Sequence, residues 1–85
     1  MIEPIVVEFL GTALLIGAGA FGGGLFALAA LAIAIALGGR ISGGHFNPAV
    51  TFFKYLHGDV GRTKAMWYVT AQYCASILIF FLSGL

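Results

Sequence analysis

The chain has 85 residues, of which 61% are hydrophobic and only 8% are charged, with four Lys/Arg against three Asp/Glu. A soluble domain carries about 25% charged residues, so this composition excludes an ordinary water-soluble protein, and the lack of basic excess excludes a nucleic-acid-binding domain. The mean hydropathy of +1.08 indicates a small integral, multi-pass protein of the lipid bilayer. So short a chain forms one domain, residues 1–85, and its single cysteine has no intramolecular disulfide partner.

The first apolar stretch carries no charged residue between Glu8 and Arg40. The N-terminus lacks the basic residues that open a signal peptide, so we expect a permanent membrane helix there. Three glycines at 22–24 favour a turn, which predicts helices over residues 4–21 and 25–38. Both are shorter than the ~20 residues of an upright span, so the bilayer would thin or the turn would be partly buried. A single tilted helix is the alternative.

A third spanning helix is predicted over residues 63–82. Trp67 and Tyr68, near its start, are typical of an interfacial aromatic belt. Small residues recur in all three predicted spans at a spacing that lets helices approach closely: Ala13, Gly17, Ala30, Ala34, Gly38, Ala71 and Ala75. In a chain so rich in Ala and Gly, this pattern alone is weak support for close packing.

A shorter helix is predicted over residues 48–57, with Asn47 as its N-cap, Pro48 in the first turn and Gly58 after its end. Ten residues span ~15 Å, about half the bilayer core, so this helix cannot cross. Its apolar stripe fits a helix lying on the membrane surface. The other interpretation is a re-entrant half-helix, with an extended segment 42–46 at membrane depth.

The ten residues SGGHFNPAVT (42–51) resemble the first Asn-Pro-Ala signature of the aquaporin family, also called the major intrinsic proteins (MIP). EFLGT (8–12) is similar to the start of the family's first helix, and YVTAQ (68–72) to its third. The resemblance implies an all-α membrane fold with three transmembrane helices and one re-entrant half-helix, which is one of the family's two inverted repeats. It also implies a channel for passive transport of water, glycerol or another small neutral solute.

The resemblance assigns the pore motif to Asn47, Pro48 and Ala49. It places four backbone carbonyls along the lumen, those of Gly43, Gly44, His45 and Phe46. The Asn47 amide would donate to water at the midplane, where the positive end of the half-helix repels cations and protons.

Two polar residues in the spans, Glu8 and Gln72, would brace the re-entrant loop, as the resemblance implies. Each has a second interpretation: Glu8 could sit at the membrane interface, and Gln72 could make an ordinary interhelical hydrogen bond. His45 could line the pore or pack under the loop, and we favour the pore. The flanking charges, Lys54, Asp59, Arg62 and Lys64, are expected to be solvated.

The sequence also departs from the family pattern. It holds one repeat, with no second Asn-Pro-Ala, and Val50 stands where the family's second motif has a pore-narrowing arginine. One half-helix encloses no pore, so we expect completion by a second half-channel chain or repeat, by an antiparallel homodimer or by parallel homo-oligomeric assembly. All four basic residues fall on the N-terminal side, which predicts a cytoplasmic N-terminus and argues against an inverted copy.

A different class remains open: a small holin-like or structural three-span protein without selective conduction, which needs no fixed Asn-Pro-Ala. No arrangement of nucleophile, base and metal ligands is visible, so we expect neither an enzyme nor a metal or other cofactor.

Overall fold

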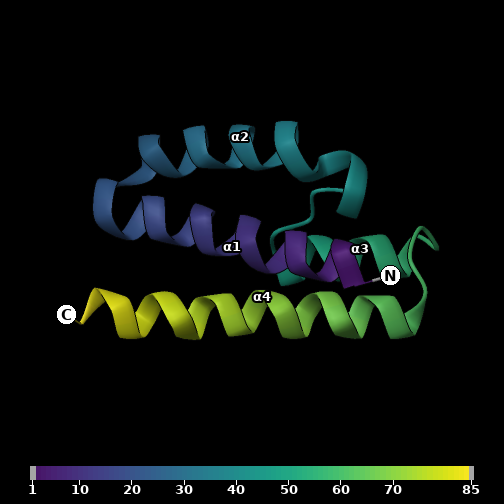
Figure 1. The fold of residues 1–85 in the computed structure, drawn as a ribbon. Helices are drawn as coiled ribbons and strands as arrows, with labels where there is room; N and C mark the ends of the chain where they lie inside the picture. The colour runs from purple at the N-terminus through teal and green to yellow at the C-terminus, as the bar shows by residue number, and fades with distance from the viewer. Residues whose placement is uncertain (1, 85) are drawn as a thin grey trace.

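The computed structural model describes residues 2–84, which form four helices and no strand (Figure 1). These are α1 (Ile2–Gly22), α2 (Gly24–Ser42), α3 (Pro48–Leu56) and α4 (Arg62–Ser83). Helices α1, α2 and α4 are long and apolar enough to cross a membrane. At ~1.5 Å per residue they match a hydrocarbon core of ~30 Å. The predicted fold class, three transmembrane helices with one short additional helix, is therefore confirmed.

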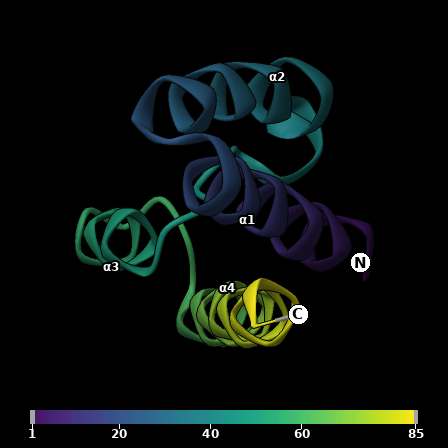
Figure 2. The same ribbon diagram turned by 90° about the vertical axis from the view of Figure 1, so that its left-hand side faces the viewer.

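Helix α1 lies between α2 and α4, and α3 lies beside α4 (Figure 2). Figure 1 shows α2 running antiparallel to α1, whereas α4 runs in the same direction as α1. The chain therefore starts at one end of the bundle and finishes at the other, as three crossings require.

The connection between α1 and α2 is a turn at Gly23, whose φ of 90° is in the left-handed region that favours glycine. The chain is thus divided at the glycine triplet, and a single tilted helix is not formed. The predicted end of the second helix at Gly38 is wrong, because α2 continues to Ser42 and ends where Gly43 takes an αL cap conformation. With 21 and 19 residues, α1 and α2 span the bilayer without the thinning expected from the shorter prediction.

Small residues line the contacts between helices. Ala30 and Ala34 of α2 are buried, as are Ala71 and Ala75 of α4. At Gly38 an added Cβ would stand 2.5 Å from Val7 Cγ1 of α1, so this glycine permits the close approach of the two backbones. Gly38 thus serves the packing of α2 against α1, and α2 continues past both Gly38 and Gly39.

After α2 the chain folds back toward the middle of the bundle, and α3 starts about half-way along α4 (Figure 1). From there α3 runs outward, along the bundle axis, to the end where α4 begins. This is the path of a re-entrant half-helix; a surface helix would lie across the end of the bundle. The segment that leads into α3 is not extended as expected, because Gly43, Gly44 and Phe46 have φ values of 93°, 69° and 54°. These left-handed residues fold the loop tightly enough to return within five residues.

Candidate functional site

Helix α3 starts part-way along the length of the bundle, and the amide side chain of Asn47 stands at its N-terminus. Asn47 is extended (φ −160°, ψ 127°), and its Oδ1 accepts a 2.8 Å hydrogen bond from the Ala49 N–H. Pro48 occupies the first turn, where its missing N–H costs no hydrogen bond. The cap uses only the Asn47 carbonyl oxygen, and within residues 2–84 its Nδ2 group donates to nothing. The exposed amide therefore presents two free donors at the N-terminus of a helix.

The loop before α3 is held by the carboxylate of Glu8, which is fully buried in α1. Its Oε2 accepts from Ser42 Oγ at 2.7 Å and from the His45 N–H at 3.1 Å. Its Oε1 accepts from the Phe46 N–H at 2.7 Å and from Gln72 Nε2 at 2.9 Å. Four donors surround the two oxygens, an arrangement that suits a carboxylate. One side chain thus joins α1, the loop and α4, and satisfies backbone groups that lipid could not.

A second group of contacts ties α3 to the same centre. The second proton of Gln72 Nε2 goes to Oγ1 of the buried Thr51, also at 2.9 Å. The Thr51 hydroxyl lies 2.9 Å from His45 Nδ1, so it can accept from Gln72 and donate to the imidazole. Burial lowers the pKa of His45, although the Glu8 charge acts in the opposite direction. Donation from Thr51 to Nδ1 corresponds to the neutral imidazole with its proton on Nε2, the form that the lowered pKa favours.

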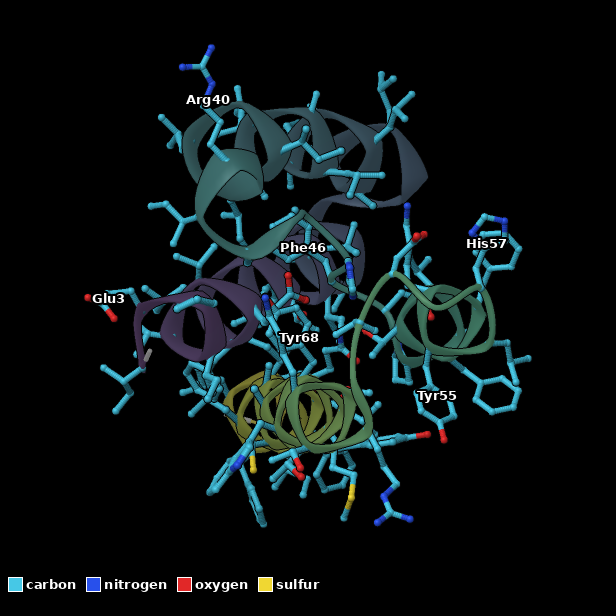
Figure 3. All side chains as sticks on the ribbon, turned by 90° about the vertical axis from the view of Figure 1, so that its right-hand side faces the viewer. Glu3, Arg40, Phe46, Tyr55, His57 and Tyr68 are labelled. Atoms are coloured by element: carbon cyan, nitrogen blue, oxygen red, sulfur yellow. The ribbon has the colours of Figure 1, made fainter. Side chains whose placement is uncertain are left out.

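Tyr68 is part of this centre and not of an interfacial belt, so that prediction is wrong. Its side chain is fully buried, and its hydroxyl donates to the Ser42 carbonyl at 2.6 Å. The Tyr68 ring and the His45 imidazole pack in a T-shaped arrangement, with ring centroids 5.0 Å apart. Figure 3 shows Tyr68 projecting from α4 toward the loop. By contrast its neighbour Trp67 is 55% exposed, as an interfacial residue would be.

Phe46 locks the loop through its side chain. It is buried despite its left-handed backbone, and its ring lies directly over Gly11 of α1. A Cβ added at Gly11 would stand 2.2 Å from Phe46 Cε1, a distance that real Cβ atoms do not show. Only glycine at this position of α1 leaves room for the ring, so Gly11 and Phe46 form one packing unit.

The structure brings together Glu8, His45, Phe46 and Gln72, and leaves Asn47, Ala49 and Val50 exposed at the start of α3. Glu8 is fully buried, and the His45 side chain is 9% exposed, with Nδ1 against Thr51 and its ring against Tyr68. That His45 lines a pore stays a prediction. Gln72 of α4 donates hydrogen bonds to Glu8 of α1 and to Thr51 of α3, so it connects three helices and not one pair.

Sequence reasoning gave no individual role to Gly11, Ser42 or Thr51, and it assigned Tyr68 to the membrane interface. One signal was available for Tyr68, which precedes Gln72 by four residues and so shares a helix face with it. Thr51, one turn after Asn47 in α3, offered the same kind of signal.

The family profile described as "Major intrinsic protein" matches residues 18–82, which is more than half of the chain. This chain belongs to the major intrinsic protein family. Among curated relatives, a probable aquaporin TIP1-2 of Oryza sativa subsp. japonica is 47% identical over 49 residues, covering 58% of this chain and 19% of the relative. Aquaporin TIP1-2 of Zea mays is 45% identical over 49 residues, with the same coverage of each chain.

Aquaporin TIP4-1 of Zea mays is 45% identical over 69 residues, covering 67% of this chain and 27% of the relative. The chain thus spans about a fifth to a quarter of the length of these relatives. No solved structure matches the chain significantly. The three apolar helices and the folded-back fourth helix are the part of the MIP fold that is present in this chain.

Proposed function

We propose that this MIP chain supplies one half of a passive membrane channel for water or small neutral solutes. The observation that carries the proposal is the start of α3, half-way along the bundle, with the Asn47 amide exposed and the loop behind it fixed by Glu8. The relatives point the same way, since they are named as aquaporins. No arrangement of this kind is needed by a protein that merely packs in the membrane or opens an indiscriminate lesion.

The proposed mechanism uses groups at the start of α3. Water in a narrow pore sheds part of its hydrogen-bonded shell, and polar groups on the wall must replace it. We assign the acceptors to the carbonyls of residues 43–46 and the donors to the Asn47 amide. The N-terminus of α3 adds a positive end of about +0.5 charge, which opposes cations and protons where water is scarcest. Val50 adds no charge beside the motif, so the barrier to cations rests on Asn47 and the helix dipole.

A second half is part of the proposal, because one half-helix encloses nothing. Helix α3 contacts α4 alone among the helices of residues 2–84, so the opposite side of α3 has no neighbour. We propose that a second repeat of opposite orientation covers it, in the same or another chain. An inverted copy of this chain is disfavoured, because its four basic residues would all face the wrong side.

The proposed orientation rests on the basic residues at the helix ends. Arg40 lies in the last turn of α2, Lys54 in the last turn of α3, and Arg62 begins α4. All three helix ends lie at the end of the bundle that holds the N-terminus (Figure 1). Cytoplasmic flanks are enriched in Lys and Arg, so we place the N-terminus in the cytoplasm.

The test is stopped-flow light scattering on proteoliposomes that contain the full chain and whatever oligomer it forms, with water, glycerol and proton flux measured together. The variant Asn47→Asp tests the two amide donors, because aspartate keeps the cap to the Ala49 N–H but removes both donors. We expect selective water flow where an oligomer or a second repeat completes the pore, and its loss in the variant. Equal leakage of all three species, unchanged by the substitution, would favour the holin-like alternative. Water flow in a preparation that crosslinks only as monomers would contradict the need for a second half.

A further inference from the structure

A groove of about 650 Å³ lies between the first turns of α1 and α4, away from Glu8 and Asn47. Its walls are mainly apolar and come from Ile2, Pro4 and Ile5 on one side and from Trp67 and Tyr68 on the other. This volume lies within the ~300–1,000 Å³ typical of small-molecule sites. Helices α1 and α4 begin at the same end of the bundle (Figure 1), and the residues that line the groove come from the starts of these two helices.

Two cations stand at the same groove. Arg62 and Lys64 of the first turn of α4 line it, and within residues 2–84 neither makes an ion pair. Lys64 Nζ lies 5.5 Å from the ring centroid of Tyr68, so the cation is held over the groove wall. Asp59, which lines a neighbouring pocket together with Lys64, contacts Lys54 and His57, and Glu3 points outward from α1 in Figure 3.

These cations occupy an unfavourable place within their own helix. A helix N-terminus carries a partial positive charge, so Arg62 and Lys64 are repelled there. The N-cap, Gly61, also provides no side-chain hydrogen bond to the free N–H groups of the first turn. An anion at this position would be attracted by both cations and by the helix end, and a chain attached to it would enter the apolar groove.

We propose that this groove binds one anionic phospholipid, with its phosphate at Arg62 and Lys64 and an acyl chain along Ile5 and Trp67. The ligand class follows from the combination of features: the walls require a hydrocarbon, the rim requires a negative charge, and the partly exposed Trp67 belongs at the headgroup level. The site stands apart from the proposed channel, so it holds whether or not the chain conducts water.

Trp67 provides the test, because it is the single tryptophan of the chain and lines the groove. The full chain is reconstituted in phosphatidylcholine vesicles in which a fixed minor fraction of lipid carries brominated acyl chains, on either phosphatidylglycerol or phosphatidylcholine. Bromine quenches tryptophan fluorescence on contact, so the two series compare occupancy by an anionic and a neutral lipid. A cation near an anionic surface contributes about 1 kcal/mol, which corresponds to roughly a fivefold preference for each of the two.

The double variant R62Q/K64Q should remove the preference for the anionic lipid. The matched control is R40Q, which removes a cation at the same end of the bundle but outside the groove, and it should keep the wild-type preference. Far-UV circular dichroism checks the fold of both variants, and neutral residues in the first turn of α4 should not weaken that helix. Equal quenching by the two lipids in the wild type, or the same loss of preference in R40Q, would overturn the proposal.

Discussion

The chain has two connections that contain glycine, and they differ in how firmly their surroundings hold them. At the turn between α1 and α2, a Cβ added at Gly23 or Gly24 would meet no atom within 4 Å. In the loop between α2 and α3, the backbone is fixed from three sides, by Glu8, by Gly11 under the Phe46 ring and by Tyr68. The first connection only reverses the chain. The second places a particular amide, that of Asn47, at a particular depth, and its surroundings are built accordingly.

The largest effect should come from Glu8→Gln. The amide would direct two protons at groups that are themselves donors, and it would leave buried donors of the loop unpaired, at about 1–3 kcal/mol each. We expect the free energy of unfolding to fall by about 3 kcal/mol, measured by far-UV circular dichroism in detergent with increasing denaturant. Glu3→Gln, on the exposed first turn of α1, is the control and should shift the midpoint far less than Glu8→Gln. Equal midpoints for Glu8→Gln and the wild type would mean that the carboxylate does not hold the loop.

The second effect is steric. Gly11→Ala places a methyl group inside the Phe46 ring contact and should cost about 2 kcal/mol of stability by overpacking. Gly24→Ala adds the same methyl group to open space at the other connection and should be neutral. Combining Gly11→Ala with Phe46→Leu should cost less than the sum of the single changes, because the two positions share one contact. Strict additivity in this double-mutant cycle would count against the packing unit.

A smaller effect is expected for Tyr68→Phe, which removes one hydroxyl and leaves the Ser42 carbonyl without its donor. The loss should be about 1 kcal/mol in the same unfolding experiment. Tyr73→Phe is the matched control, because Tyr73 belongs to the same helix and is 57% exposed. If the two variants behave alike, the buried hydroxyl contributes nothing specific to the loop.

The smallest effect belongs to the outer end of α3, where Lys54 and Asp59 form an exposed pair 3.9 Å apart. Exposed ion pairs contribute about 0–1 kcal/mol and weaken in salt. Asp59→Asn should therefore change the free energy of unfolding by less than about 0.5 kcal/mol, and the difference should vanish at high salt. A loss as large as that of Tyr68→Phe would show that both ends of α3 are equally anchored.

Much of this fold could be predicted because it is specified by local patterns in the sequence. Long apolar stretches predict spanning helices, the glycine triplet predicts the turn, and Asn47-Pro48 predicts a helix start. The end of α2 was missed because Gly38 reads as a helix breaker, whereas its packing against Val7 depends on a neighbour far along the chain. The left-handed loop was missed for a similar reason, since Phe46 takes a positive φ only because the loop contacts hold it there.

The candidate site divides in the same way. The motif residues Asn47, Pro48 and Ala49 could be chosen from the sequence, and Glu8 and Gln72 stood out as polar residues in apolar helices. The partners that complete the network, Thr51 and Tyr68, are common residue types whose importance comes only from the contacts between α3, α4 and the loop. The buried position of the His45 ring likewise depends on those contacts.

The central claim is that α3 begins near the middle of the bilayer and ends near its surface. Site-directed spin labels at Ala49→Cys and Leu56→Cys, two exposed positions placed in a Cys74→Ser background, report depth through their accessibility to oxygen and to a polar nickel reagent. Seven residues of helix correspond to about 10 Å. We expect the label at position 49 to lie deeper than the label at position 56 by about that distance. Equal depths at the headgroup level would place α3 flat on the membrane and contradict the account.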